Sequence, residues 1–254
     1  MTPPSVVLTG DAVAQMVRAA ERAHNVQGLR LAIIGGLAVT CRLGHVHRAT
    51  GDVDAVVDEV VGLATHSGAQ LLVEAGIAEP DPGDRARRVF IDGTKLEIID
   101  TQALPVDISD IGAPLPRLFV LGHRWALESA EPLRVIVAAS DVDVMLPVAM
   151  PAALVATKLH AFCDRQQDEK RASDAYDIYR LLETRDRDGA VADATNNGPR
   201  GLPKVVRELM VERFIDGATR VVRYLKAYGD PAWPEITGDD VQRVVRSFTS
   251  RLRG

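Results

Sequence analysis

The first hundred residues alternate between helical and extended hydrophobic patterns. Apolar residues recur at helical spacing from Asp11 to about His24, which predicts an amphipathic helix. Short β-branched runs predict buried strands at Leu29–Ile34 and Val53–Val57. The pattern favours a helix between these strands, at Leu37–Leu43, and another after the second strand, at Asp58–Ala75.

More extended segments follow. Two apolar runs between Arg87 and Ile99 meet at Asp92-Gly93, a dipeptide suited to the positive φ angles of a tight turn, so we expect a hairpin there. Two later runs, Leu133–Ala138 and Val142–Val148, also have the character of strands.

Beyond Pro147 and Pro151 the pattern favours helices alone. The predicted helices are Ala152–Cys163, Ser173–Glu183, Lys204–Asp216, Ala218–Tyr228 and Val241–Leu252, with a long polar loop at Thr184–Pro203. We therefore expect an α+β fold in two domains. A small mixed sheet flanked by helices would occupy residues 1–148, and an all-helical domain would occupy residues 149–254.

Composition narrows the class of protein. Hydrophobic residues make up 46% and charged residues 26% of the chain, as in ordinary globular proteins. No run of about 18 apolar residues predicts a membrane span, and the N-terminal segment lacks the pattern of a secretory signal. Cys41 and Cys163 lie in apolar helical contexts without metal-site spacing, so we expect buried thiols. Together these features favour a cytoplasmic protein.

The formal net charge of −5 is unevenly distributed. The segment from Lys204 to Gly254 holds 10 Lys and Arg against 7 Asp and Glu, a balance of +3, which leaves −8 for residues 1–203. This division suits a metal-binding half joined to a phosphate-contacting half, and it equally suits an ordinary solvated helix surface.

The first group of candidate catalytic residues lies between positions 33 and 57. Gly35-Gly36 ends a strand and opens a helix, so its backbone N–H groups are free to face an anion. Asp52 and Asp54 alternate with buried Val53 on a strand and therefore point the same way. Two carboxylates on one face suit Mg²⁺, which completes its octahedron with water and substrate phosphates.

Other interpretations of these motifs exist. A single Asp-x-Asp most often marks a solvated turn or a calcium loop, and this is our interpretation of Asp141-Val142-Asp143, which no glycine pair precedes. The glycines do not fit the Gly-x-Gly-x-x-Gly dinucleotide pattern, which argues against a Rossmann fold. His45 and His47 lie between the glycine pair and Arg48; like His123 and His160, they have no ligand-like grouping.

A second group of charged residues lies in the helical half. Lys158 and Arg165 are seven apart and so share a helix face. Ser173 is a candidate N-cap, which would put Asp174 in the first turn and Asp177 one turn later. The alternative is a surface Lys/Arg helix that is salt-bridged to a neighbouring acidic helix.

These two groups carry a family resemblance. The pattern Gly-Gly followed by Arg48-x-Thr50-x-Asp52-x-Asp54 resembles the first motif of the DNA polymerase β-like nucleotidyltransferase superfamily. Within it, PAALVATKLHAFCDRQQDEKRASDAYDIYRLL, residues 151–182, resembles the AbiEii/AbiGii (MenT-like) toxins, in Pro-x-x-Leu-x-x-x-Lys, a later Arg and Asp-x-x-Asp-Ile. The similarity spans about residues 30–183.

The resemblance implies a nucleotidyltransferase sheet and assigns roles to these residues. Asp52 and Asp54 would bind Mg²⁺, and Lys158 would contact the triphosphate, with Asp177 or Asp174 organising the site. The nucleotide-binding set implied is Gly35, Gly36, Arg48, Thr50, Lys158, Arg165 and Asp174. A third catalytic carboxylate is expected on a neighbouring strand: Glu97 is favoured over Asp100, which ends the strand on the opposite face, although an edge-strand charge is an alternative.

The resemblance also implies the reaction and its partners. A nucleoside triphosphate would donate a nucleotide to the 3′ end of transfer RNA, and an antitoxin from the same operon would be a protein partner. Basic residues toward the C-terminus are candidates for RNA phosphate contacts: Arg207, Arg213, Arg220, Arg223, Lys226, Arg243, Arg246 and Arg251. The alternatives are a small-molecule acceptor of the aminoglycoside type and a catalytically silent binding module.

Overall fold

The computed structural model describes residues 3–58, 67–101, 111–228 and 235–253. The chain divides into two compact units. The sheet unit comprises Met1–Leu104 and Ala126–Met150, and the helical unit comprises Pro105–Trp125 and Pro151–Gly254. The structure therefore has the mixed α/β part and the helical part that the sequence predicts, and the α+β class is confirmed.

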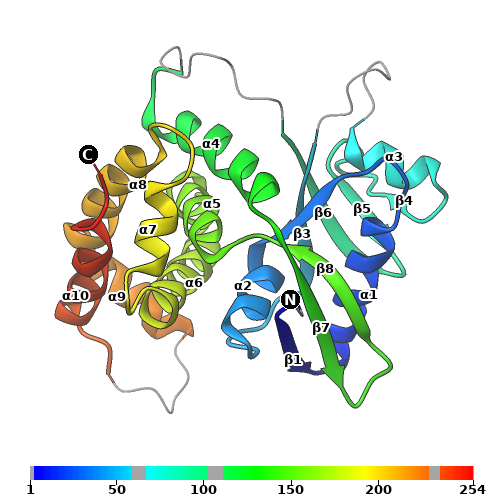
Figure 1. Cartoon of the computed structure of the whole chain (residues 1–254), viewed down its shortest axis with the longest axis horizontal. Helices are drawn as coiled ribbons and strands as arrows, with labels where there is room; N and C mark the ends of the chain where they lie inside the picture. Colours follow the sequence, from blue (N-terminus) through cyan, green and yellow to red (C-terminus); the bar gives the residue numbers. More distant parts are fainter. Residues whose placement is uncertain (1–2, 59–66, 102–110, 229–234, 254) are drawn as a thin grey trace. The chain divides into compact units, whose positions relative to one another are not determined.

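One mixed sheet forms the core of the sheet unit (Figure 1). Its strand order is β1-β7-β8-β2-β3-β6-β5-β4. Its strands are β1 Ser5–Thr9, β2 Leu31–Ile34, β3 Asp52–Asp58, β4 Glu79–Pro80, β5 Arg88–Ile91, β6 Thr94–Thr101, β7 Glu131–Ala138 and β8 Asp143–Val148. The central β3 pairs antiparallel with β2 and parallel with β6, so it is hydrogen-bonded on both sides.

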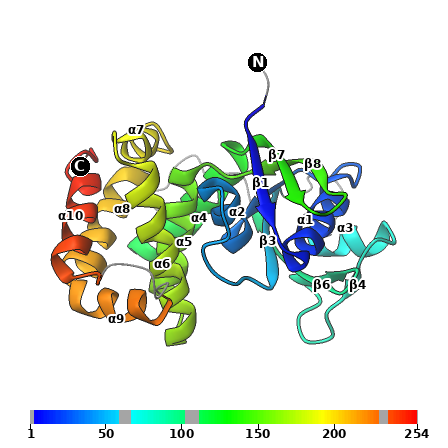
Figure 2. The ribbon, with the colours of Figure 1, turned by 90° about the horizontal axis from the view of Figure 1, so that it is seen from below.

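In the described part of the sheet unit, three helices pack on this sheet: α1 Asp11–His24, α2 Gly35–Leu43 and α3 Gly68–Glu74. In both views α1 and α3 lie on one side of the central strands and α2 on the other (Figures 1 and 2). The face toward α3 is apolar, since Gly68 lies against the side chains of Val57 and Ile98. That side therefore buries an apolar core.

The helical unit is built around α6. Helix α6 packs against α5, α9 and α10, and Figure 2 shows these helices beside one another. The helices are α4 Pro114–Glu128, whose last residues belong to the sheet unit, α5 Pro151–Asp164, α6 Asp168–Arg185, α7 Ala190–Asn196, α8 Leu202–Met210, the π-helical turn η2 Val211–Ile215, α9 Ala218–Tyr228 and α10 Gly238–Thr249. Phe214, Phe248 and Leu225 are fully buried between them.

Several predicted elements are confirmed. The hairpin forms with Asp92 and Gly93 at φ 49° and 77°, as a two-residue turn between β5 and β6 requires. Strands β2, β3, β7 and β8 lie within a few residues of their predicted positions. After Val148 the described residues contain helices and no further strand.

Other predictions are wrong. The helix predicted for Asp58–Ala75 does not begin at Asp58, which belongs to β3; its described part is α3, and residues 59–66 lie outside the described residues. The predicted loop Thr184–Pro203 contains α7, a short Ala-rich helix that the buried Val191 and Ala192 anchor. Strand β1 and helix α4 were not predicted at all.

Ser173 is not an N-cap. Helix α6 begins five residues earlier, at Asp168, with Gln167 at the N-cap position. Ser173 lies in mid-helix, where its hydroxyl donates to the backbone carbonyl of Lys170 at 2.8 Å. Asp174 and Asp177 are therefore interior helical residues, and no first-turn dipole effect applies to them.

Candidate active site

Two carboxylates share one face of β3. Asp52 and Asp54 are partly exposed, whereas Val53 and Ala55 are fully buried on the other face. Because β3 and β6 run parallel, Asp52 lies in register with Lys95, and Asp54 with Glu97. Residues aligned in this way present their side chains on the same face of a sheet. At the end of the two strands where β3 begins, one face, here called the carboxylate face, therefore carries the carboxylates of Asp52, Asp54 and Glu97 and the ammonium group of Lys95.

Helix α2 begins directly beside Asp54. Gly35, the first residue of α2, has φ +68°, in the left-handed region that glycine adopts without strain. A Cβ atom at Gly35 would lie 1.9 Å from Asp54 Oδ2 and 2.6 Å from its Cγ. Only glycine leaves room for the carboxylate here, so the Gly-Gly motif and the Asp-x-Asp motif are a single structural feature.

The second glycine leaves room for two other predicted residues. A Cβ atom at Gly36 would lie 2.8 Å from Arg48 Nη2 and 2.8 Å from Thr50 Oγ1. Arg48 also donates to the carbonyl of Ala49 at 2.9 Å. The segment from Arg48 to Thr50 thus folds back over the first turn of α2. The glycine pair lies against these polar side chains, and its backbone N–H groups are of the kind that bind an anion at a helix N-terminus.

Lys95 is a site residue that the sequence interpretation missed. Its Nζ lies 3.1 Å from Asp52 Oδ2, and both side chains remain about one-third exposed. The signal is the spacing of two residues between Lys95 and Glu97, which places both on the same strand face. That spacing identifies Lys95 only when the parallel pairing of β6 with β3 is known.

The two candidates for the third carboxylate lie on opposite faces of β6. Glu97 is beside Asp54 on the carboxylate face. Asp100 accepts a hydrogen bond from the backbone N–H of Gly68 at 2.8 Å, at the first residue of α3. Asp100 therefore accepts from an N–H group at the N-terminus of α3, on the face of the sheet opposite to Asp54. Because Asp100 faces away from Asp54, Glu97 is the better candidate for the third carboxylate.

The helical unit brings its four predicted residues together. Lys158 Nζ lies 3.0 Å from Asp174 Oδ1 and 2.8 Å from Asp177 Oδ2. Arg165 lies 3.1 Å from the other oxygen of Asp174. The alternative interpretation, a surface Lys/Arg helix paired with an acidic helix, is correct about which residues pair. It is wrong about their exposure, since the two carboxylates are fully buried and Lys158 is 7% exposed.

This cluster has defined electrostatics. Two cations and two carboxylates balance in charge, as burial requires, since an unpaired buried charge costs several kcal/mol. Lys158 is fixed between α5 and α6 by both carboxylates, whereas the Arg165 side chain is 36% exposed and opens toward solvent. The cluster can present cationic groups to an anion from a rigid base.

The residues predicted to be uninvolved have structural partners. Asp143 forms a two-point contact with Arg134 at 2.6 and 2.7 Å, and this hydrogen bonding lowers the pKa of Asp143. His47 Nδ1 lies 3.4 Å from Thr40 Oγ1. His123 is buried against Phe119 and His160, and burial lowers its pKa to about 4, so it is neutral near pH 7.

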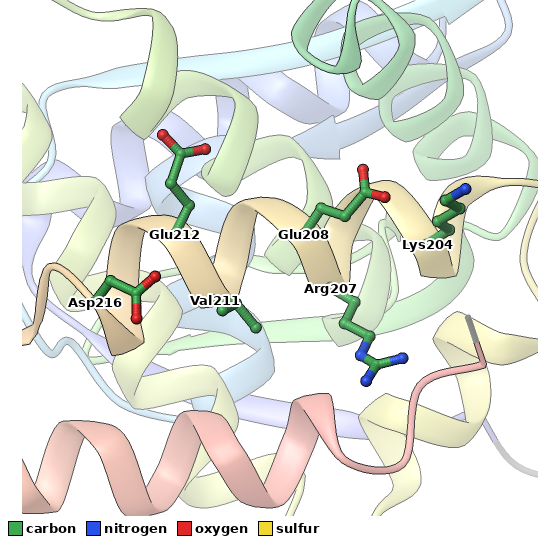
Figure 3. Close-up of a pocket in the computed structure, with 6 residues that line it drawn as sticks. All are labelled: Lys204, Arg207, Glu208, Val211, Glu212 and Asp216. Atoms are coloured by element: carbon green, nitrogen blue, oxygen red, sulfur yellow. The ribbon is translucent and has the colours of Figure 1, made fainter.

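An open groove of about 410 Å³ runs along α8 and η2 (Figure 3). Its lining is mostly charged: Lys204, Arg207, Glu208, Val211, Glu212 and Asp216. Three carboxylates against two cations do not favour a phosphate ligand. Of the residues with a predicted role, only the candidate RNA contact Arg207 lines this groove, and no predicted catalytic or nucleotide-binding residue does.

The C-terminal basic residues differ in their surroundings. Many are paired with carboxylates at 3.0–3.1 Å: Arg213 with Glu212, Lys226 with Glu235 and Arg243 with Asp240. Within the described chain no carboxylate pairs with the exposed Arg220 and Arg223, which lie one turn apart on α9. Among the described residues, Arg207 on α8 and Arg246 on α10 are also exposed and lack a carboxylate partner, so α9 is one of several exposed basic positions of the helical unit.

The donor groups of the carboxylate face are of the type that magnesium prefers. The described residues hold no group of three or more His, Cys, Asp or Glu side chains ready to enclose a cation. Mg²⁺ does not need such a cage, because it commonly takes one or two carboxylates together with water and substrate phosphates. Asp52 and Asp54, partly exposed on one strand face, offer that donor set.

Among the residues described, none of the helices has the length and apolar character of a bilayer-crossing segment.

Comparison with known proteins identifies the class: the chain is a nucleotidyltransferase. The family model described as nucleotidyl transferase AbiEii toxin, of a type IV toxin–antitoxin system, matches residues 18–200, so the chain belongs to the AbiEii family. This segment contains both residue clusters. Family membership implies a nucleoside triphosphate substrate and an antitoxin partner.

A crystal structure of an antigenic nucleotidyltransferase-like protein from Paracoccidioides brasiliensis is similar at 18% identity, with a TM-score of 0.47, over 85% of this chain and 93% of that one. No curated protein matches the sequence.

Proposed function

We propose that this chain transfers a nucleoside monophosphate from a Mg²⁺-bound triphosphate to the 3′ end of transfer RNA. The observation that carries the proposal is the carboxylate face of β3 and β6. Asp52, Asp54 and Glu97 lie side by side there, and Gly35 lets the first turn of α2 approach Asp54. Carboxylates beside a helix N-terminus suit a metal-bound triphosphate.

The roles of the residues follow from their chemistry. Mg²⁺, when bound by Asp52 and Asp54, supplies a Lewis acid that polarises the phosphoryl oxygens. We propose that the Glu97 carboxylate accepts the proton of the acceptor hydroxyl. The acceptor oxygen bonds to the α-phosphorus, the bond from that phosphorus to the bridging oxygen breaks, and pyrophosphate leaves. Arg48 and Thr50, held beside Gly36, are the proposed nucleotide contacts of the sheet unit.

In the helical unit we propose phosphate binding by Lys158 and Arg165. The family resemblance gives Lys158 this role, and Asp174 and Asp177 fix its ammonium group. Because Arg165 is the more exposed of the two cations, it is the more accessible to an anion. Asp177 then acts through Lys158 as a positioning residue.

The acceptor assignment rests on the family and on α9. The exposed Arg220 and Arg223 can contact successive phosphates of an RNA backbone. If they do, tRNA affinity should fall steeply with salt, and the Arg220→Ser/Arg223→Ser variant should have a salt dependence shallower by about two phosphate contacts. Unchanged salt dependence would favour the runner-up, a small cationic acceptor, which suits the net charge of −5.

The direct test incubates the protein with Mg²⁺, each labelled nucleoside triphosphate in turn, and total tRNA. Wild-type protein should label RNA, and Asp54→Asn should lose about a thousandfold in rate, since a metal ligand is worth several kcal/mol in the transition state. The matched control is Asp58→Asn, which removes a carboxylate from the far end of the same strand.

Glu97 and Asp100 are separated by the same assay. Glu97→Gln should abolish transfer, whereas Asp100→Asn should keep it, because Asp100 only caps α3. Equal rates in wild type and Glu97→Gln would remove Glu97 from the mechanism. Absence of transfer to RNA, protein or aminoglycoside with every nucleotide would favour the third candidate, a catalytically silent binding module.

A further inference from the structure

A single ammonium group lies among the carboxylates of the proposed metal site. Lys95 is in register with Asp52, and its Nζ lies 3.1 Å from Asp52 Oδ2. The two side chains are 32% and 36% exposed, so water reaches both partners. An ion pair this open is worth at most about 1 kcal/mol, which corresponds to a factor of about five in an equilibrium constant. Such a pair can form and break as ligands bind.

The surrounding charges explain why a cation is held there. Asp54 and Glu97 are aligned neighbours on the two strands, and Asp52 adds a third negative charge to the face. Like charges directly opposite on adjacent strands repel each other. Lys95 offsets part of this repulsion and contacts the very carboxylate that the proposed function gives to the metal. An ammonium group and a metal ion therefore compete for Asp52.

We propose that Lys95 is a positioning residue that substitutes for the metal in the metal-free enzyme. It holds the Asp52 carboxylate in place, and it is displaced when Mg²⁺ arrives with the triphosphate. The inference rests on the proposed function, since it requires Asp52 to be a metal ligand. It sets the metal affinity low, so that the metal binds well only with the additional oxygens of the nucleotide.

The chain contains a matched comparison for this pair. Arg30 lies 3.5 Å from Asp58, the last residue of β3, in an ion pair that is also solvent-exposed. Asp58 is six residues from Asp52, which is about 20 Å along a strand. Removing either cation removes one ion pair from the same strand, but only Lys95 lies at the proposed metal site.

The test measures Mn²⁺ binding to the full chain without nucleotide, by the electron paramagnetic resonance signal of free Mn²⁺. A dication about 5 Å from an ammonium group is repelled even through water. Lys95→Met should therefore bind Mn²⁺ about tenfold more tightly than wild type, while Lys95→Arg and Arg30→Met should bind it as wild type does. In thermal unfolding, Mn²⁺ should raise the Tm of Lys95→Met more than that of wild type, because tighter binding to the native state stabilises it more.

Two outcomes separate this inference from the proposed function. If Asp52→Asn abolishes Mn²⁺ binding while Lys95→Met and Lys95→Gln bind as wild type does, the metal site stands and the role of Lys95 is refuted. If Asp52→Asn leaves Mn²⁺ binding unchanged, both are refuted. A purely structural Lys95 would lower the Tm of Lys95→Met without changing its Mn²⁺ affinity, which also overturns the inference.

Discussion

Replacing Gly35 by alanine tests the tight contact between the first turn of α2 and the carboxylate of Asp54. The new methyl carbon would lie 1.9 Å from Asp54 Oδ2, 2.6 Å from Cγ and 2.7 Å from Cβ. It would also sit on a backbone at φ +68°, where residues with a side chain are strained. Gly35→Ala therefore combines a backbone cost with displacement of a proposed metal ligand.

Both costs can be estimated. The left-handed backbone costs about 1–2 kcal/mol for alanine. Non-bonded carbon and oxygen atoms keep roughly 3 Å apart, so Asp54 has to move by about 1 Å, and overpacking of this kind adds about 1–3 kcal/mol. Misplacing a reacting group by about 1 Å costs about a hundredfold in rate. We expect Gly35→Ala to lose stability moderately and turnover severely.

Gly44 provides the control at the other end of the same helix. It has φ +87°, and a Cβ atom there would meet no heavy atom within 4 Å. Gly44→Ala should lose about 1–2 kcal/mol in urea unfolding and keep its turnover under conditions where it is folded. Nucleotide transfer and unfolding are measured on both variants and on wild type.

A double-mutant cycle locates the clash. In the background of Asp54→Gly, which removes the obstructing side chain, Gly35→Ala should destabilise the protein only by its backbone cost. Equal stability losses and equal turnover in Gly35→Ala and Gly44→Ala would refute the reasoning, because the approach of Asp54 to α2 would then impose no constraint.

Three further predictions concern buried groups. Lys158→Met should lower the free energy of unfolding by about 3–5 kcal/mol in urea, since it leaves Asp174 and Asp177, both fully buried, without their shared cation. The pKa of His123 is lowered to about 4 by burial, below its unfolded value near 6.5, so the unfolded state binds the proton first. The stability contributed by neutral His123 should therefore be lost as pH falls from 6.5 to 4, by about 3 kcal/mol, and His123→Leu should flatten this pH dependence. Burial raises the pKa of Cys41 to about 12, so its thiol should resist iodoacetamide at pH 8 in native protein and react after unfolding, as mass spectrometry would show.

Each of these three predictions would be contradicted by a specific result. A loss under about 1 kcal/mol in Lys158→Met would mean that water reaches its two carboxylates and that the cluster is a surface network. A stability profile unchanged by His123→Leu would assign the acid sensitivity to other groups; His45→Leu, at an exposed position, is the control that should leave the profile unchanged. Rapid alkylation of native Cys41 would show that α2 opens readily.

The sequence predicts best where the signal is local. The turn at Asp92-Gly93 and the shared face of Asp52 and Asp54 each depend on neighbouring residues, and both are present in the structure. The pattern does not predict α7, because seven residues between polar, glycine-containing segments are too few to show a helical period; the helix forms through the burial of Val191 and Ala192. The start of α6 was misplaced because Ser173 is a good N-cap by type, while its hydroxyl bonds within the helix.

The candidate site was predictable up to the point where strands pair. Alternation along β6 places Lys95 and Glu97 on one face and Asp100 on the other, but it does not say which face joins Asp54. Moving the pairing with β3 by one residue would exchange the two sets. The observed register aligns Glu97 with Asp54 and leaves Asp100 to bind the N-terminus of α3. Because Val53 and Ala55 must be buried on the core side with Leu96 and Ile98, that register is the one that hides the apolar side chains of both strands. The same burial brings Lys95 beside Asp52, so the cation of the site follows from how the hydrophobic core is packed.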